Sequence, residues 1–298
     1  MKPRLALIGP GRLGQAVTAR LREAGYPISA VIGRDLNKAQ AAARFIGAEL
    51  MATDQLRRCA AAQAILIAVA DDAIAEVAGH LHASGLVTPH TLLVHFSGLH
   101  PAQILVGPAE NPCLALHPLQ TFASAAQGKS ALEGCTYSLQ GDALAVESGQ
   151  QLVADLGGQA FILPAEMKAR YHAAACLVSN YVTTLVAEAC QLLAEVDGAD
   201  ELFPRALGPL LQTAVANTLT MGPQQALTGP IVRGDSGTLA LHLSTLAEQC
   251  PQQLPLYREL ARRTLDLAAR SERLSKEDQC KLSACLDSRD EPPSLTAG

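Results

Sequence analysis

The stretch of sequence that decides the fold is Leu5-Ala6-Leu7-Ile8-Gly9-Pro10-Gly11-Arg12-Leu13-Gly14. Its apolar start predicts a β-strand from Leu5 to Ile8, and a helix-like segment from Gln15 to Ala24 follows the glycines. A second apolar run, Ile28 to Ile32, completes a βαβ unit. In such a unit the first glycine permits a tight turn, the second lets the backbone approach a pyrophosphate, and the third lets helix and strand pack closely. We therefore expect residues 9–14 to hold a dinucleotide at the helix N-terminus.

The residues after the second strand indicate which dinucleotide is preferred. An acidic residue there would bind a free ribose 2′-hydroxyl, but the chain continues Gly33-Arg34-Asp35. The planar guanidinium of Arg34 can pair with a 2′-phosphate, and Gly33 leaves room for that group. This favours NADP, with NADPH preferred over NADH. In the alternative, Arg34 is solvated and Asp35 caps the next helix or binds the ribose.

Length and composition restrict the class of protein. A chain of 298 residues with 49% hydrophobic and 17% charged residues is long and apolar enough for two globular domains. The net charge of -5, the 3% aromatic content and the lack of a basic run argue against a nucleic-acid partner. The eight cysteines are scattered without metal-like spacing, so we predict buried thiols, no metal site and a reducing cytoplasm. We also predict no signal peptide and no membrane-spanning segment.

The order of apolar runs predicts an α/β fold, a Rossmann-like doubly wound, mainly parallel sheet followed by an all-helical domain. We expect the NADP-binding domain to cover residues 1–164, a helical substrate and dimerisation domain to cover 165–287, and a disordered tail to cover 288–298. One continuous helix is predicted from Ala165 to Val196, because that stretch has no Gly or Pro. The further strands are predicted at Ala64 to Val69, Leu92 to Val94, Leu114 to Leu116, Thr136 to Leu139 and Ala160 to Leu163.

Polar residues follow three of these strands, where ligands bind in doubly wound sheets. Val69 ends one strand and Ala70 and Asp71 follow it, and all three are expected beside the cofactor. Ser97 and Gly98 follow the next as candidate substrate contacts, and His117 follows the third as a candidate acid. The alternatives are that Asp71 or the adjacent Asp72 caps a helix, and that His117 is structural.

A polar row runs along the helix that opens the second half. Lys168, His172, Ala175 and Ser179 share one narrow stripe, and Asn180 lies one step round from it. Hydride addition to a carbonyl or imine requires a proton, so Lys168 and His172 are candidate acids, and Ser179 and Asn180 are candidate substrate contacts. In the alternative, Lys168 is a solvated first-turn residue and His172 a surface histidine.

The loop Thr228-Gly229-Pro230-Ile231-Val232-Arg233-Gly234-Asp235 is a rigid turn that carries an arginine between glycines. Asp235 is expected to cap the following helix. Arg233 is a candidate clamp for a substrate carboxylate or for the cofactor.

Together, residues 9–14, His117-Pro118-Leu119-Gln120-Thr121-Phe122, Lys168 with Tyr171-His172-Ala173-Ala174, Ser179-Asn180 and the 228–235 loop resemble a known family. It consists of uncharacterised Rossmann-like proteins joined to a helical domain of unknown function (domain of unknown function 2520), in the 6-phosphogluconate dehydrogenase-like superfamily. The resemblance implies NADP binding, dimerisation through the helical domain and a reductase activity.

Lys168 and Ser97 are similar to the catalytic lysine and the carboxylate-binding serine of related hydroxyacid dehydrogenases and ketopantoate reductases. The asparagine four residues after that lysine is replaced here by His172, a departure from the pattern.

These observations lead to the expectation of an NADP-dependent oxidoreductase that transfers hydride to a small carbonyl or imine substrate and forms a homodimer. The alternative from another class is a non-catalytic NADP-binding sensor or scaffold, which would bind the cofactor without oxidising it.

Overall fold

The computed structural model describes residues 1–288, except for the side chains of 199, 200 and 202–204. The predicted tail lies outside the described residues apart from Ser288. The chain divides into two compact units, Met1–Tyr181 and Val182–Gly298.

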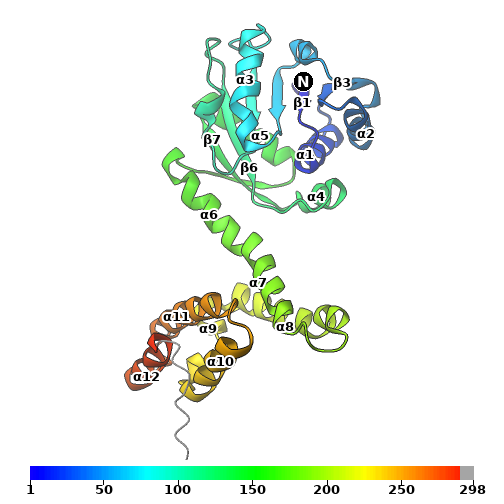
Figure 1. Ribbon diagram of the computed structural model, residues 1–298. Helices are drawn as coiled ribbons and strands as arrows, with labels where there is room; N and C mark the ends of the chain where they lie inside the picture. The colour runs from blue at the N-terminus through cyan, green and yellow to red at the C-terminus, as the bar shows by residue number, and fades with distance from the viewer. Residues whose placement is uncertain (289–298) are drawn as a thin grey trace, which may run out of the picture. The chain divides into compact units, whose positions relative to one another are not determined.

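The first unit is built on one mainly parallel sheet (Figure 1). Among the described residues the sheet has eight strands in the order β3-β2-β1-β4-β5-β6-β7-β8, and β6 and β7 are antiparallel whereas the other pairs are parallel. This confirms the predicted doubly wound sheet. The strands are β1 (Leu5–Ile8), β2 (Ile28–Ile32), β3 (Ala52–Thr53), β4 (Ala64–Ile67), β5 (Leu92–His95), β6 (Cys113–Pro118), β7 (Thr136–Gly141) and β8 (Gln159–Ile162).

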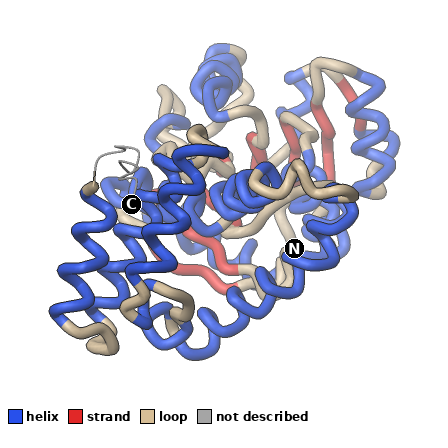
Figure 2. The backbone as a smooth tube through the Cα atoms, turned by 60° about the horizontal axis from the view of Figure 1, so that its bottom comes forward, coloured by secondary structure: helices blue, strands red, loops and turns tan. Residues whose placement is uncertain are grey.

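Helices cover both faces of the sheet (Figure 2). The central strands β1 and β4 are apolar along their whole length, so successive side chains pack alternately into a core on one face and a core on the other. Leu5 and Leu7 of β1 belong to one core, whereas Ala6 and Ile8 belong to the other. The first core is closed by α1 (Arg12–Glu23), α2 (Leu36–Ile46) and α5 (Ala143–Asp155). The second is closed by α3 (Ile74–Ala83) and the short helices η2 (Leu56–Ala61) and η4 (Ala102–Leu105).

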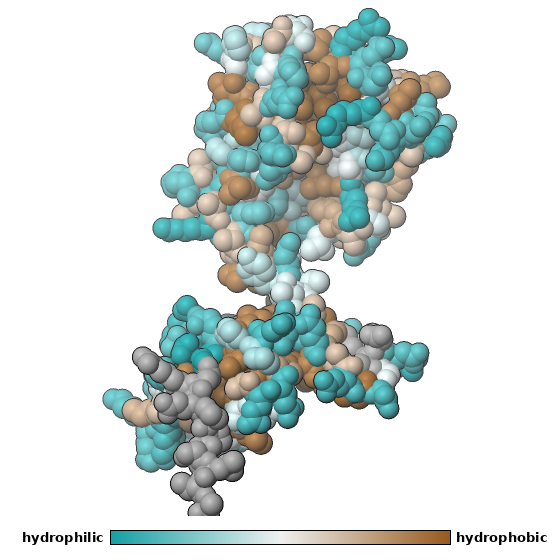
Figure 3. Space-filling view, in the orientation of Figure 1, coloured by the Kyte–Doolittle hydropathy of each residue, from teal (hydrophilic) through white to brown (hydrophobic). Residues whose placement is uncertain are grey.

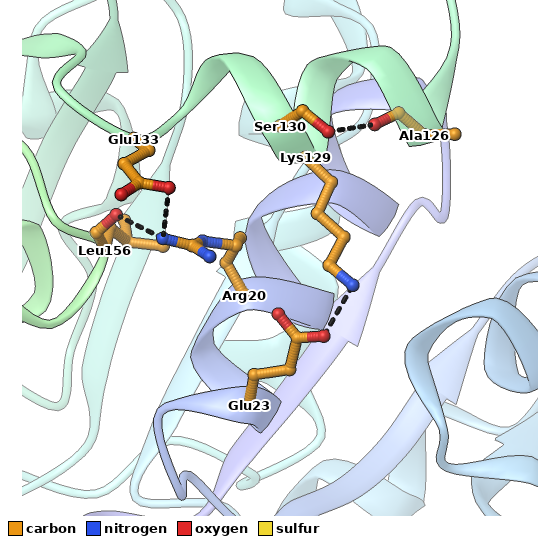
Figure 4. Close-up of polar contacts among 7 residues, drawn as sticks. All are labelled: Arg20, Glu23, Ala126, Lys129, Ser130, Glu133 and Leu156. Atoms are coloured by element: carbon orange, nitrogen blue, oxygen red, sulfur yellow. Dashed lines mark hydrogen bonds and ion pairs between the residues drawn. The ribbon is translucent and has the colours of Figure 1, made fainter.

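Helix α4 (Ala125–Ala131), which lies in the connection between β6 and β7, packs on α1 (Figure 4). Lys129 Nζ on α4 lies 2.5 Å from Glu23 Oε1 on α1. Arg20 of α1 lies 3.9 Å from Glu133 and donates to the Leu156 carbonyl at 3.5 Å. Such exposed ion pairs contribute about 0–1 kcal/mol each, so they orient the connection more than they stabilise it.

The single helix predicted from Ala165 to Val196 is wrong in its continuity. The structure has α6 (Lys168–Val178) and α7 (Asn180–Gln191), separated at Ser179, whose φ and ψ are -122° and -78°. The Ser179 hydroxyl donates to the Ala175 carbonyl at 2.7 Å, a local bond that competes with the backbone ladder. The first compact unit extends to Tyr181, and side chains of α6 bond at the ends of the sheet strands. The domain bounds expected from the sequence, 1–164 and 165–287, stay a prediction.

One helical stretch, Ala165–Gln191, has the length and composition of a membrane-spanning helix. Length and composition alone do not test the expectation of no membrane-spanning segment, which stays a prediction. The polar stripe of this stretch begins with Lys168, whose ammonium bonds within the first unit.

The second unit is helical over its described residues, as predicted. Its helices are α8 (Ala199–Met221), α9 (Pro223–Ala226), α10 (Ser236–Gln249), α11 (Leu254–Arg270) and α12 (Lys276–Asp287), besides α7 from Val182 onward. Leu239, Ala268 and Leu282 form the centre of its core with exposed fractions of 0%. Apolar side chains also reach the surface of both units (Figure 3).

All eight cysteines are free thiols. Cys59, Cys113 and Cys135 are buried as expected, but Cys280 is exposed and the other four are half-buried. The described residues contain no cluster of three His, Cys, Asp or Glu side chains that could hold a metal.

Candidate functional site

The glycine loop leaves β1 in a conformation that requires its glycines. Gly9 has φ +82°, and a Cβ there would lie 2.7 Å from Val69 Cγ1 and 2.8 Å from the Ala68 carbonyl oxygen. A Cβ at Gly14 would lie 2.9 Å from Ala68 Cβ and from the Gly9 oxygen. The first and third glycines thus allow the turn and the packing of α1 against the sheet.

The second glycine lies beside open space. A Cβ at Gly11 would meet nothing within 4 Å, and among the described residues no side chain caps α1. The first backbone N–H groups of α1 are therefore available to an anion, which the helix dipole also favours. The residues present fit a dinucleotide pyrophosphate.

The region after β2 contains the candidate ribose contacts. Asp35 caps α2, since its Oδ1 accepts from the Asn37 and Lys38 N–H groups at 2.9 and 3.2 Å. Helix capping is one of the two roles that the alternative interpretation of the sequence gave to Asp35. Arg34 is exposed, and Gly33 lies close to the glycine loop because a Cβ there would be 3.3 Å from Pro10 Cγ. Arg34 therefore follows a turn that adjoins the cofactor loop.

Asp71, Ser97 and Lys168 form a hydrogen-bonded group at the carboxyl ends of β4 and β5. Ser97 Oγ donates to Asp71 Oδ2 at 2.7 Å, and Lys168 Nζ donates to the Ser97 carbonyl at 3.2 Å. Ser97 Oγ also accepts from the Leu99 and His100 N–H groups at 3.1 and 3.0 Å. The serine hydroxyl is thus engaged as one donor and twice as an acceptor, which is its full capacity.

Lys168 is 1% exposed, so the interpretation as a solvated first-turn residue is wrong. Burial lowers its pKa to about 8, while Asp71 acts in the opposite direction. Its ammonium can release a proton near pH 8, and the resulting amine can take one up. Neither Asp71 nor Asp72 caps α3: its N-cap is Ala73, and no side chain of the described residues caps it.

His117 lies at the end of β6 and meets the same helix, α6. Its Nδ1 is 2.8 Å from the Tyr171 hydroxyl, and the two rings meet edge to face with centroids 5.5 Å apart. The His172 ring centroid lies 6.2 Å from that of His117. Burial, with the charges of Lys168 and His172, lowers the pKa of His117 to about 4, so its imidazole is neutral at neutral pH.

Gly98 lies against both histidine rings. A Cβ at this position would be 2.7 Å from His172 Cδ2 and 3.0 Å from His117 Nε2. Only a residue without a side chain lets the two rings approach the strand end this closely. His172 is half-buried, so it is not a free surface histidine.

His95, in β5, has a structural role. Its Nδ1 accepts from the Ser97 N–H at 3.1 Å, and its Nε2 lies 3.3 Å from the Pro101 carbonyl. Burial, with the charge of Lys168, lowers its pKa to about 4. A neutral His95 therefore carries its proton on Nε2 and fixes the 95–101 turn.

The structure brings together Asp71, Ser97, Gly98, His117, Lys168 and His172 from the predicted site residues. Ser179 follows Lys168 by about 16 Å along the helix, at 1.5 Å per residue, and with Asn180 it lies outside this group. Arg233 is exposed on the second unit, where Asp235 caps α10 as predicted.

Sequence reasoning did not assign a role to Tyr171. The signal was present, because Tyr171 follows Lys168 by three residues and so shares its side of the helix.

Two family models match the chain. Residues 4–92 match the model described as NADP oxidoreductase coenzyme F420-dependent, and residues 135–264 match the domain of unknown function DUF2520. The family resemblance inferred from the sequence is thereby confirmed. Among curated proteins, none matches this chain.

Solved structures share the fold. A putative NADP oxidoreductase from Bacteroides fragilis is 23% identical with a TM-score of 0.72, over 89% of this chain and 98% of that chain. A protein from Thermotoga maritima is 24% identical with a TM-score of 0.66, over 91% and 100%. A pyrroline-5-carboxylate reductase from Coxiella burnetii is 16% identical with a TM-score of 0.57, over 93% and 100%.

Proposed function

Because the chain joins a segment of the NADP oxidoreductase type to a DUF2520 segment, we propose that it is an NADP-dependent reductase of a small carbonyl or imine compound. The observation that carries this proposal is the polar group of Asp71, Ser97, His117 and Lys168. It lies at the carboxyl ends of neighbouring parallel strands, and the glycine loop follows β1 in the same sheet. Ligands of doubly wound sheets bind at this edge.

The residues that would hold the cofactor follow from the loop geometry. The N–H groups at the start of α1, with Gly9, Pro10, Gly11, Arg12, Leu13 and Gly14, would bind the pyrophosphate, and Arg34 beside Gly33 would bind a 2′-phosphate. Val69, Ala70 and Asp71 would border the cofactor after β4. The bound nicotinamide supplies the hydride. The exposed guanidinium of Arg34, which follows Gly33, supports the preference for NADPH.

The substrate would lie against the Ser97-Gly98 turn, within reach of His117 and His172. The candidate proton donors are Lys168, His172 and His117. The roles of Ser179, Asn180 and Arg233 as substrate contacts stay predictions from the sequence, and Ser179 and Asn180 lie outside the group around Ser97.

The helical unit is proposed to form a homodimer. On α8 the apolar side chains of Leu211, Val215 and Leu219 follow each other at four-residue spacing with exposed fractions of 37%, 45% and 82%. A second copy would cover this row. Light scattering on the purified protein would distinguish the mass of two chains, which the proposal predicts, from the mass of one chain, which would contradict it. The free thiols support a reducing, cytoplasmic setting.

One observation favours the second candidate, an NADP-binding sensor. The Lys168 ammonium is 1% exposed and the Ser97 hydroxyl is saturated, so two of the candidate groups have little access to a substrate. A sensor would bind NADP(H) and report its redox state to a partner without oxidising it.

The experiment is a fluorescence titration with NADPH and with NADH, followed by NADPH oxidation with 2-oxo acids, aldehydes and cyclic imines such as 1-pyrroline-5-carboxylate. Tight NADPH binding with turnover of one panel member is expected. Binding without turnover of any compound would favour the sensor, and binding of neither dinucleotide would overturn both candidates.

A further inference from the structure

The Tyr171 hydroxyl is directed at Nδ1 of His117 by packing on two sides. Its ring meets His117 edge to face at an interplanar angle of 90°, and it meets Phe161 of β8 at 5.9 Å and 67°. Together with the 2.8 Å contact between the hydroxyl and Nδ1, this fixes the orientation of the imidazole about the β6 strand end.

Two directions are open to this hydrogen bond, because a neutral phenol and a neutral imidazole can each donate or accept. Burial lowers the pKa of His117 and raises the pKa of Tyr171, so both groups are neutral at neutral pH. A phenol that donates its single proton to Nδ1 leaves the imidazole proton on Nε2.

The Nε2 edge of that imidazole faces Gly98, since a Cβ at position 98 would lie 3.0 Å from Nε2. His117 is half-buried, so part of its ring remains accessible beside the glycine. A neutral imidazole with its proton on Nε2 is a hydrogen-bond donor. It can hydrogen-bond to a developing alkoxide and remain neutral itself.

We propose that Tyr171 is a positioning residue that holds His117 in the Nε2–H tautomer, and that this N–H donates to the oxygen of a carbonyl substrate beside Gly98. The proposal rests on the proposed function and narrows its substrate class. A carbonyl oxygen accepts this hydrogen bond, whereas a protonated iminium nitrogen has no lone pair to do so.

The reaction balances without a change in the protonation state of His117. The hydride and its electron pair form a C–H bond at the carbonyl carbon, the C=O π pair moves to oxygen, and NADPH becomes NADP⁺. The oxygen then takes one proton from solvent and gives the alcohol. His117 stabilises the charge on oxygen during the transfer.

The second unit offers a matched control. His242 Nδ1 lies 2.7 Å from the Tyr257 hydroxyl, with ring centroids 5.9 Å apart at 83°, so the same kind of pair occurs outside the proposed site. Tyr171→Phe and Tyr257→Phe each remove one hydroxyl from one such pair and leave the ring.

The test is ¹⁵N NMR of the full-length protein labelled at histidine, with the His117 signal assigned by its loss in His117→Asn. In the wild type we expect a protonated Nε2 and a bare Nδ1 at pH 7. The groups around the ring are Tyr171, Lys168, His172 and Asp71, so spectra from pH 5 to 9 establish whether the tautomer persists over this range. Tyr171→Phe should shift His117 toward a mixture of tautomers, and Tyr257→Phe should leave its signal unchanged.

An Nδ1–H tautomer in the wild type would overturn the proposal even if Tyr171→Phe failed to fold. An unchanged His117 signal in a folded Tyr171→Phe variant would do so as well. These spectra require no turnover, so their outcome is separate from the failure of the proposed function.

Kinetics test the substrate class. Tyr171→Phe should lower kcat with an active aldehyde or 2-oxo acid about tenfold, the effect of one lost neutral hydrogen bond, with KM for NADPH unchanged. Tyr257→Phe should retain wild-type kcat. Turnover of cyclic imines in the absence of any carbonyl turnover would overturn the assignment of a carbonyl substrate.

Discussion

Replacement of Lys168 by methionine tests the electrostatics of the site without knowledge of the substrate. The ammonium is 1% exposed, and burial lowers its pKa from 10.5 to about 8. At 1.36 kcal/mol per pKa unit, this difference corresponds to a penalty of about 3 kcal/mol for folding with a charged Lys168. Methionine has a similar length and no charge, so Lys168→Met removes that penalty.

The sign follows from proton binding. Below pH 8 the lysine is charged in both the folded and unfolded states, and its penalty is constant. Between pH 8 and 10.5 the unfolded chain holds more protons at this site than the folded chain, so the free energy of unfolding of the wild type rises with pH. Lys168→Met lacks this rise.

Other groups oppose the trend, so the comparison must be a difference between variants. Burial raises the pKa of the Cys59 thiol to about 12 and that of Cys113 to about 11, which lowers stability in alkali in both proteins. Urea unfolding followed by circular dichroism at several pH values would give the wild-type minus Lys168→Met difference. We expect that difference to rise by about 3 kcal/mol from pH 8 to 10.5.

Lys38→Met is the control, because the Lys38 side chain is 84% exposed. Its difference from the wild type should stay nearly constant over the same pH range. If the wild-type minus Lys168→Met difference in the free energy of unfolding stayed constant over this pH range, the claim that burial destabilises the charged form of Lys168 would be refuted.

Three further substitutions test the rest of the site. Gly98→Ala adds a methyl group 2.7 Å from His172 Cδ2 and 3.0 Å from His117 Nε2, so kcat should fall at least about tenfold with unchanged NADPH affinity in a fluorescence titration. Wild-type turnover would contradict this geometry. Arg34→Ser should raise the Kd for NADPH about tenfold or more and leave the Kd for NADH nearly unchanged, whereas equal losses would remove the 2′-phosphate role. Gly14→Val should weaken both dinucleotides together and lower the melting temperature, because a Cβ there meets three heavy atoms within 3.1 Å; retained binding would refute the role of this glycine.

The sheet could be predicted from the sequence because its central strands are buried on both faces. Continuous apolar runs bounded by turns gave β1 and β2 with their observed ends. β3 was not predicted, since Ala52–Thr53 is too short to show a period. The break at Ser179 was also missed, because composition alone does not reveal a side chain that bonds to the carbonyl four residues back.

The site was predicted at the level of strand ends and one helix face, which is the level that topology determines. Asp71, Ser97, His117 and Lys168 come together because parallel strands end at one edge of the sheet. Which atoms pair could not be predicted, since hydrogen bonds depend on rotamers and on neighbours distant in sequence. Tyr171 acquires its role only through a partner 54 residues away.

The hydrogen bonds also give the candidate residues roles that differ from those expected from the sequence pattern. The Ser97 hydroxyl is saturated and the Lys168 ammonium is sealed against the Ser97 carbonyl, so neither side chain presents an open polar atom to a substrate. Lys168 still acts through its charge, because that charge helps to lower the pKa of His117. Burial and a nearby cation both lower the pKa of an imidazole, which favours a neutral N–H donor over a cationic acid. Burial, with the charge of Lys168, therefore keeps His117 neutral, and the His117 ring beside Gly98 is the group proposed to meet a carbonyl oxygen.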